Sequence, residues 1–296
     1  MAEGLQFILI AGPTASGKSA LAVRIAEALG GEIVNADSMQ VYRDLAILSA
    51  RPTPDEQAGI PHHLFGFVDG AHEFSVGEYL AAVAALPPSR PLILVGGTGL
   101  YFRALTEGLV EAPTVPPEIR QVIAARLAAG EDMHAALRLV DPAGAERLSP
   151  ADLPRIQRAL EMQMTTGEAF SVWRSRHPGT PPLKPGSWKG LFLAPDRETL
   201  YARIDRRFEM MTESGALDEV ERLRERHLPA NRGVMKAHGV PHLIRYLDGV
   251  VTLEEAVRLG QQDTRNYAKR QITWARKFMR DWEWVHDEEE GLRACL

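Results

Sequence analysis

The chain has 296 residues, of which 45% are hydrophobic and 25% are charged, and its formal net charge is −5 at pH 7. This length allows one large domain or a core with a smaller insert, and the charge gives no global sign of nucleic-acid binding. One cysteine, Cys295, excludes internal disulfides and a cysteine-rich zinc site, and the absence of a basic leader or a long apolar stretch predicts a cytoplasmic protein without membrane contact.

The first predicted elements are a strand at residues 6–11, which is nearly all apolar, and a helix at residues 19–29. Between them lies a G-x-x-x-x-G-K-S loop, which consists of Gly12, Pro13, Thr14, Ala15, Ser16, Gly17, Lys18 and Ser19. In this order the backbone N–H groups of the loop and the helix N-terminus surround one point, which favours a bound anion. We therefore predict a phosphate site, with charge from Lys18 and a Mg²⁺ ion on the Ser19 hydroxyl. The loop leaves open which phosphate compound binds.

A second strand is predicted at residues 32–36, directly before Asp37. Ligands of open α/β sheets bind outside the carboxyl ends of the strands, so we expect Asp37 in the same crevice as Lys18. An aspartate there can act as a base or a magnesium ligand, and a helix N-cap is an equally good explanation. The adjacent His62 and His63 lie in a segment rich in Pro, Gly and His; their side chains diverge, which favours a loop role over a metal site.

Residues 75–86 have helical spacing, and a buried strand follows and ends in Gly96, Gly97 and Thr98. An ATP-hydrolysing P-loop enzyme usually carries an acidic residue at the end of this strand. Its replacement by glycine and threonine makes a hydrolysing enzyme less favoured and leaves any magnesium to Asp37 and Ser19.

The chain changes character at the prolines of residues 113–117. Helical spacing at residues 118–130, 132–140 and 153–166, followed by a linker rich in Pro and Gly at 176–188, predicts an all-helical insertion domain at 116–188. A strand at 190–195 then returns the chain to the sheet, before helical stretches near 198–226, 236–247 and 253–281. The predicted fold is α/β, a P-loop NTPase-like parallel sheet flanked by helices, with a core domain made of residues 1–115 and 189–296.

Two groups of basic residues have open interpretations. Arg155 and Arg158 share one helix face, and Arg265, Lys269 and Arg276 follow helical spacing late in the chain. Such faces can contact phosphodiesters or simply be solvated and paired with acids. Likewise, the arginines of residues 203–207 can clamp a phosphate or lie on the surface.

Taken in order, these motifs resemble those of the bacterial tRNA dimethylallyltransferases, also called tRNA isopentenyltransferases. The resemblance extends from residue 7 to about residue 285. It is carried by the phosphate loop and by residues 37–42, 61–64, 96–101, 155–160, 203–208 and 264–274. The combination is specific, whereas the phosphate loop alone is shared by many unrelated enzymes.

The resemblance implies transfer of a dimethylallyl group from dimethylallyl pyrophosphate to N6 of the adenosine immediately 3′ of the anticodon, with release of pyrophosphate and with Mg²⁺ as cofactor. It implies that Asp37 is the general base, that Lys18 and Arg207 neutralise the pyrophosphate, and that Thr98 lies near the adenosine, which is flipped out of its stack. Ser19 and Asp37 are the implied metal ligands.

The resemblance also implies a monomer in which the helical insert covers the tRNA anticodon stem-loop. The implied tRNA contacts are Asp37, Ser38, Met39, Gln40, Thr98, Arg120, Pro154, Arg155, Ile156, Gln157 and Arg158. Two departures from the family pattern occur. Residues 239–242 lack the usual aromatic and basic residues, and Leu153 and Pro154 replace a more usual Pro-Gln pair.

Two other functions remain compatible with the residues. A small-molecule kinase would bind ATP in the loop, use Arg155 and Arg158 as an adenine lid and use Asp37 as base toward a hydroxyl. A non-catalytic RNA-binding module would leave Lys18, Ser19 and Asp37 unexplained as a set.

Overall fold

The computed structural model describes residues 6–86 and 90–296. The chain forms two compact units, a core made of Met1–Thr106 and Pro182–Leu296, and a helical unit made of Glu107–Pro181. The bounds of this helical unit differ from the predicted bounds of the insert, 116–188. The sequence shows only where the first helix of the insert begins and where the chain returns to the sheet. Leu183 belongs to the core instead, since its side chain is buried there and its N–H donates to the Leu105 carbonyl at 3.0 Å.

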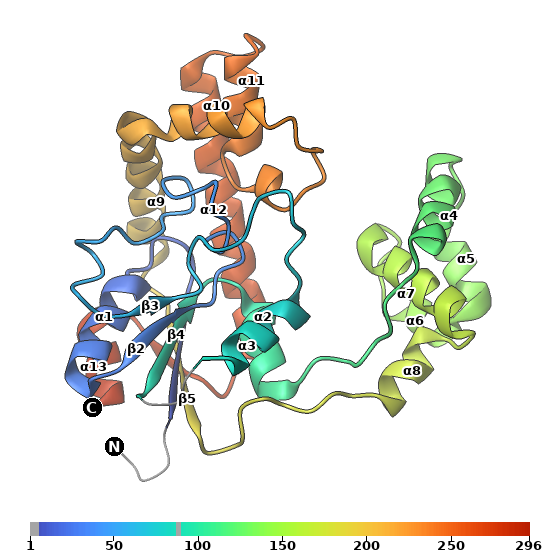
Figure 1. Cartoon of the computed structure of the whole chain (residues 1–296), viewed down its shortest axis with the longest axis horizontal. Coiled ribbons are helices and arrows are strands. Elements are labelled where there is room, and N and C mark those ends of the chain that lie inside the picture. Colours follow the sequence, from blue (N-terminus) through green and yellow to red (C-terminus); the bar gives the residue numbers. More distant parts are fainter. Residues whose placement is uncertain (1–5, 87–89) are drawn as a thin grey trace. The chain divides into compact units, whose positions relative to one another are not determined.

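The core unit is built on a parallel sheet of six strands (Figure 1). The strands are β1 (Phe7–Ala11), β2 (Glu32–Asn35), β3 (His62–His63), β4 (Leu92–Gly96), β5 (Trp188–Leu193) and β6 (Glu283–Val285), in the order β3-β2-β4-β1-β5-β6. The apolar runs of β1 and β4 pair in register, with Ile10 opposite Val95, and are buried on both faces. The predicted fold class, a parallel sheet flanked by helices, is confirmed.

Helices cover both faces of this sheet. On one face, α1 (Lys18–Leu29) and α13 (Glu288–Cys295) pack against side chains such as Ile10 and Leu193. On the other face, α2 (Val76–Ala84), α3 (Gly99–Glu107) and the C-terminal part of α12 (Leu253–Phe278) pack against Leu9 and Leu94. The two apolar layers hold the strands so that their carboxyl ends open toward one edge of the sheet.

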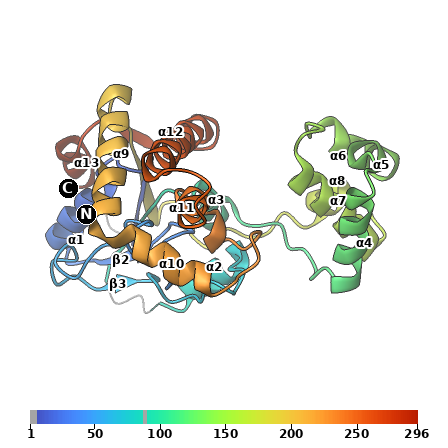
Figure 2. The ribbon, with the colours of Figure 1, turned by 90° about the horizontal axis from the view of Figure 1, so that it is seen from above.

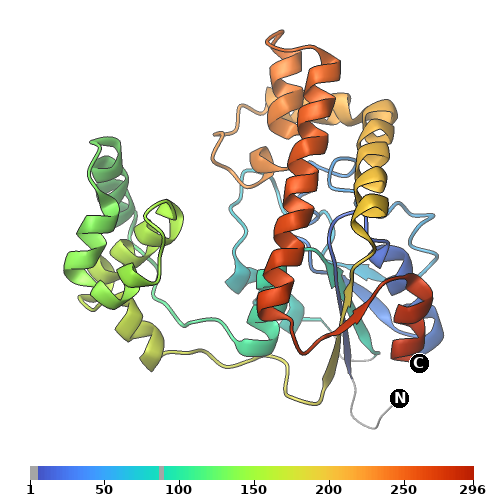
Figure 3. The same ribbon diagram turned by 180° about the vertical axis from the view of Figure 1, so that it is seen from behind.

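Further helices lie beyond that edge and depart from the predicted pattern. They are α9 (Arg197–Met211), the π-helix η1 (Thr212–Ala216), α10 (Leu217–Glu225), the 3₁₀-helix η2 (Val234–Lys236) and α11 (Val240–Leu247). The predicted continuous helix at 198–226 is interrupted at η1, where Gly215 has a φ of 101°. The helix predicted from 236 begins only at Val240, because Gly239 has a φ of 94° and Pro241 favours the first turn. Figure 3 shows α12 running beside α9.

The helical unit is a separate group of helices (Figure 2) and has an apolar core of its own. It consists of α4 (Pro117–Ala128), α5 (Met133–Val140), α6 (Pro142–Glu146), α7 (Leu153–Thr166) and α8 (Phe170–Arg176). Ile123, Leu137, Ile156 and Leu160 are buried together within it. A cluster of this kind indicates a unit that is stabilised by its own packing.

The C-terminal helix α13 is not among the predicted elements. The Asp287 side chain accepts a hydrogen bond from the Glu290 N–H at 2.8 Å, and the three glutamates that follow Asp287 occupy the first turn, where negative charge is favoured. Cys295 packs beside α1 and the sheet, and this burial raises the pKa of its thiol to about 11. Within residues 6–86 and 90–296, the helices are too short or too polar to cross a membrane.

Candidate active site

The phosphate loop joins β1 to α1 at the carboxyl edge of the sheet. Gly12 packs so closely that an added Cβ would lie 2.8 Å from the Leu193 carbonyl oxygen, and Gly17, with a φ of 99°, starts the helix. Ser16 is only 3% exposed, and its hydroxyl has no hydrogen-bond partner among the described residues. A buried hydroxyl without a partner beside a helix N-terminus fits a group that binds a phosphate.

Two cations meet at this loop. The Lys18 ammonium donates to the Pro13 carbonyl at 3.1 Å, and burial lowers its pKa to about 8, with Asp37 opposing the change and Arg207 adding to it. Arg207 projects from α9 and donates a hydrogen bond to the Thr14 hydroxyl; burial also lowers its pKa. The sequence left Arg207 between surface and phosphate roles, and the structure places it against the loop.

Asp37 lies just beyond the end of β2. Its Oδ1 accepts the Met39 N–H at 2.9 Å, while Asn35 fixes the Asp37 backbone through bonds of 2.8 Å to its N–H and 2.9 Å to its carbonyl. Asp37 thus begins a local turn at residues 38–41 and does not cap a helix, so the N-cap alternative is wrong. Its other oxygen, Oδ2, accepts no hydrogen bond from the described residues, which leaves it available to a ligand.

Thr98 follows the end of β4, next to Asp37. Its Oγ1 accepts the Ser38 N–H at 2.9 Å and donates to the Ser38 hydroxyl at 3.2 Å. The preceding residue, Gly97, is closely packed, because an added Cβ would lie 2.2 Å from the Gln271 amide nitrogen and 3.2 Å from Asp37 Oδ2. The ends of β2 and β4 therefore bring Asp37, Ser38 and Thr98 into one group.

Three adjoining cavities surround these residues. One of about 490 Å³ is lined by Ser16, Lys18, Ser19 and Arg207, and a second of about 190 Å³ by Arg207, Asp37 and Ser38. The third, about 220 Å³, is mostly apolar and shares Ser38 and Tyr267 with the second; its walls include Thr98, Phe192, Trp274 and Met279. The arrangement brings together the loop predicted to bind phosphate, a carboxylate and an apolar chamber.

Three residues that border these cavities, Tyr267, Gln271 and His238, have roles that the sequence did not reveal. Tyr267 and Gln271 lie four residues apart on α12 and so share the face turned to the site. His238 lies against the Tyr267 ring, with centroids 4.5 Å apart, and burial and then Arg270 lower the pKa of His238. The segment 264–274 is recognisable as a motif, but its spacing alone does not show which side chains face the site.

The residues predicted to contact tRNA are in several environments. The Gln40 amide donates to the carbonyls of Ser49 and Ala50 at 2.9 and 2.8 Å, so it shapes the neighbouring loop. In the helical unit, Arg120, Pro154 and Arg155 are exposed and Gln157 and Arg158 are half-buried, whereas Ile156 is 0% exposed and belongs to the core of that unit. Ile156 therefore has a packing role.

The helical unit also contains a basic cavity of about 280 Å³. Arginines line it from α7 and α8 and from the end of α6: Arg147, Arg155, Arg158 and Arg174. Arg155 pairs with Asp152 at 2.7 Å and Arg158 approaches Glu161 at 3.7 Å, whereas Arg147 and Arg174 form no ion pair with the described residues. Unpaired guanidinium groups around a cavity suit an anionic ligand.

The sequence contains two sets of possible metal ligands, the histidine pair and Ser19 with Asp37. His63 Nε2 lies 2.7 Å from Glu32 Oε2, and His62 Nδ1 lies 2.8 Å from the Ile60 carbonyl. Both histidines of β3 therefore have partners within the protein. Within residues 6–86 and 90–296, no cluster of three His, Cys, Asp or Glu side chains forms a metal site. Ser19 and Asp37 line different cavities.

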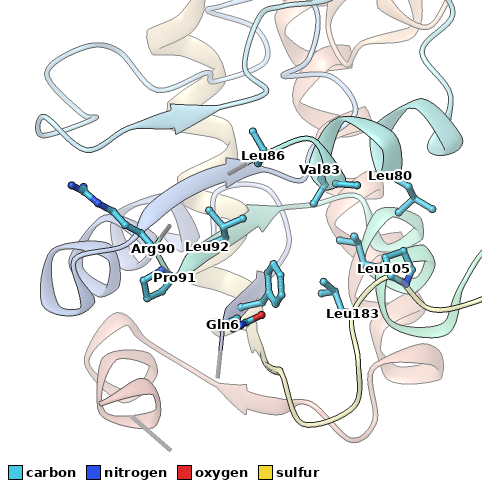
Figure 4. Close-up of a pocket in the computed structure, with 12 residues that line it drawn as sticks. Gln6, Leu80, Val83, Leu86, Arg90, Pro91, Leu92, Leu105 and Leu183 are labelled. Carbon is cyan, nitrogen blue, oxygen red and sulfur yellow. The ribbon is translucent and has the colours of Figure 1, made fainter. Parts of the chain in front are cut away.

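Another cavity, of about 410 Å³, lies at the opposite edge of the sheet (Figure 4). It is bordered by the first residues of β1 and β4, Phe7 and Leu92, and by leucines such as Leu80 and Leu183. Arg90 is the one charged side chain among the described residues that line it. The part of its lining that the structure describes offers one cation and no carboxylate or histidine for acid–base chemistry.

Comparison with known proteins agrees with this geometry. A family profile described as IPP transferase matches residues 40–278, and a second, described as isopentenyl transferase, matches residues 5–64. A tRNA dimethylallyltransferase of Rhodopseudomonas palustris is 54% identical over 95% of this chain and 90% of its own length. The chain belongs to the tRNA dimethylallyltransferase family. Membership in this family makes it a transferase and confirms the predicted resemblance.

Further similarities extend to another bacterium and to solved structures. The tRNA dimethylallyltransferase of Methylobacterium nodulans is 54% identical over 95% of both chains. The tRNA isopentenylpyrophosphate transferase of Bacillus halodurans has a TM-score of 0.69 at 32% identity, over 98% of this chain and 93% of its own. A eukaryotic dimethylallyltransferase acting on tRNA has a TM-score of 0.79 at 28% identity, over 92% of this chain and 70% of its own.

Proposed function

We propose that this protein transfers the dimethylallyl group of dimethylallyl pyrophosphate to N6 of the adenosine immediately 3′ of the anticodon in tRNA, and releases pyrophosphate. Family membership supports the proposal. The observation that carries it is the meeting of the phosphate loop, Asp37 and Thr98 at the carboxyl ends of three neighbouring strands, beside an apolar chamber. At one place, this combination can bind the pyrophosphate leaving group, accept a proton and accommodate the apolar dimethylallyl group.

In the proposed reaction, the N6 amine attacks C1 of the dimethylallyl group. The N–C1 bond forms while the C1–O bond to pyrophosphate breaks, and the N6 proton passes to Asp37 Oδ2. The amine is a poor nucleophile because its lone pair is delocalised into the purine, so a positioned base contributes a factor of about 10²–10⁴ in rate. Lys18, Arg207 and the loop N–H groups stabilise the charge that develops on the departing pyrophosphate.

A magnesium ion fits the phosphate end of this site. We propose that Ser19, an exposed hydroxyl without a partner among the described residues, holds Mg²⁺ together with the pyrophosphate oxygens. The ion would neutralise phosphate charge when bound. Asp37 lines a different cavity from Ser19, so we assign its carboxylate to the proton in preference to its other predicted role as a metal ligand.

For the RNA substrate, we propose that the helical unit binds the anticodon stem-loop. The exposed Arg120 and Arg155 and the basic cavity of α6, α7 and α8 support this role, because guanidinium groups bind phosphodiesters. Asp37, Ser38, Met39 and Thr98 would then contact the flipped adenosine. Since one chain supplies the groups of the proposed site, we propose that the protein acts as a monomer. We propose that it acts in the cytoplasm.

The test is to incubate the protein with Mg²⁺, dimethylallyl pyrophosphate and an anticodon stem-loop, and to weigh the RNA by mass spectrometry. We expect one added dimethylallyl group on a single adenosine. Asp37→Asn should lower kcat by about 10²–10⁴, because an amide cannot take the proton but still accepts the Met39 N–H.

A parallel sample with ATP in place of the prenyl donor addresses the kinase alternative, which the family assignment does not favour. Phosphate transfer from ATP without prenyl transfer would contradict the proposed function. Full activity in Asp37→Asn would contradict only the proposed role of the Asp37 carboxylate as proton acceptor.

A further inference from the structure

Gln271 connects the two chemical halves of the site through one side-chain amide. Its residue is only 9% exposed, on the inner face of α12. The amide oxygen accepts the Thr14 N–H at 3.0 Å, and the amide nitrogen donates to the Gly97 carbonyl at 2.9 Å. Thr14 belongs to the phosphate loop, and Gly97 precedes Thr98.

The two hydrogen bonds of Gln271 lie just beyond the point at which the pairing of β1 and β4 ends. The register of β1 and β4 ends at Ala11 opposite Gly96, so the Thr14 N–H and the Gly97 carbonyl lie beyond the last paired residues. Without Gln271 both groups would need another partner, since buried backbone polar groups are nearly always paired. A carboxamide carries a donor group and an acceptor group on the same carbon, which suits this pair of backbone groups.

Both ends of the bridge touch residues of the proposed chemistry. Thr14 receives a hydrogen bond from Arg207, and an added Cβ on Gly97 would lie 2.2 Å from the Gln271 nitrogen and 3.2 Å from Asp37 Oδ2. The amide therefore sets the spacing between the loop that holds the leaving group and the turn that carries the proton acceptor and Thr98. Tyr267, one turn earlier on α12, lines the same cavity as Gln271 and Thr98.

We propose that Gln271 is a positioning residue that keeps the pyrophosphate site and the proton-acceptor site in register for transfer. This role rests on the proposed function. Because each half of the site keeps its own binding groups, loss of the bridge should leave ligand binding largely intact and slow the reaction itself. Misplacing reacting groups by about 1 Å can cost a factor of about 10² in rate.

The test uses Gln271→Met, which keeps the length of the side chain and removes both hydrogen bonds. We expect kcat to fall by about tenfold to a hundredfold, while the Kd of inorganic pyrophosphate, measured by calorimetry, changes little. Hydrogen exchange should accelerate at residues 12–17 and 96–98 together. Gln271→Glu retains an acceptor for Thr14 but turns an oxygen toward the Gly97 carbonyl, so it should not restore kcat.

Gln261→Met is the matched control. Gln261 lies on the same helix, and its amide donates to the Asp205 carbonyl at 3.1 Å, away from the site cavities. It should keep wild-type kcat and wild-type exchange at both segments.

Three results would overturn the role of Gln271. They are a kcat of Gln271→Met within about twofold of wild type, a loss of pyrophosphate affinity as large as the loss of kcat, or an equal loss of kcat in Gln261→Met. Absence of transfer by the wild-type protein would instead overturn the proposed function, and this role with it.

Discussion

Lys18 shows how single residues of this site depend on one another. Burial lowers the pKa of its ammonium group to about 8, the Asp37 carboxylate opposes that shift, and the Arg207 guanidinium adds to it. The three side chains therefore form one electrostatic group, although they come from α1, from the end of β2 and from α9. A bound pyrophosphate would favour the charged form of Lys18 and thereby raise its pKa.

This coupling predicts a pH dependence of pyrophosphate binding. Lys18 is charged below a pKa of about 8 and becomes neutral above it, so the affinity should fall as the pH rises from 7 to 9. Calorimetric titration with inorganic pyrophosphate measures the effect. Lys18→Arg keeps the charge throughout this range, so it should show only the pH dependence of the pyrophosphate itself. An identical profile for the wild-type protein and Lys18→Arg would contradict the prediction.

At the scale of elements, α10 supports the segment that follows the site. Glu219 is 5% exposed, and its carboxylate accepts backbone N–H groups of Ala46, Ile47 and Leu48. That segment leads to Ser49, whose carbonyl accepts the Gln40 amide. The break at η1 turns α10 away from the direction of α9.

Removal of this carboxylate should destabilise the core unit. Glu219→Ala leaves three partly buried N–H groups without this partner, and we expect a loss of about 3 kcal/mol in the free energy of unfolding, measured by urea denaturation. Glu221→Ala, an exposed position on the same helix, should change it by less than about 0.5 kcal/mol. Equal stability of the two variants would show that the N–H groups find other partners.

The basic cavity of the helical unit predicts a change in the salt dependence of RNA binding. Replacing the unpaired Arg147 and Arg174 with alanine should weaken anticodon stem-loop binding and reduce the slope of log K against log salt by about 1 for each phosphate that the variant no longer neutralises. Fluorescence anisotropy over a salt series measures this slope. Arg126→Ala removes an arginine that is paired with Glu131, at 2.5 Å, and serves as the control. An unchanged slope in the double variant would place the RNA elsewhere.

At the scale of the whole molecule, the chain leaves and re-enters the core unit at neighbouring points. The Leu183 N–H donates to the Leu105 carbonyl at 3.0 Å, and each unit has its own buried cluster. The helical unit is therefore inserted into the core unit without contributing a strand to its sheet.

We therefore expect that replacement of residues 107–181 by a short Gly-Ser linker leaves a folded core. It should unfold cooperatively in calorimetry and bind pyrophosphate as the intact protein does, but lose affinity for the anticodon stem-loop. Loss of cooperative unfolding would show instead that the core needs the helical unit for its stability.

The sequence alone was sufficient for features that depend on neighbouring residues. The apolar runs of β1 and β4, the phosphate loop between β1 and α1 and the helical spacing of α2 each have a short-range cause. Parallel strands also place their carboxyl ends at one edge, which is the reason Asp37 was expected near the phosphate loop; Asp37 and Thr14 of that loop line one cavity. The order of the motifs was enough to identify the family.

Tertiary structure decided what depends on residues far apart in the chain. Helical periodicity could not show the break at η1, because Gly215 is compatible with a helix until packing selects its positive φ. The acidic start of α13 has the composition of a charged tail, and only its cap at Asp287 and its packing beside α1 make it a helix. Gln271 bonds to Thr14 across 257 positions, and no local pattern distinguishes it from Gln261. The sequence therefore determined which chemical groups the protein has. The packing of α9 and α12 against the strand ends decided which of these groups act together. Contacts between distant segments form only when apolar faces are buried against each other.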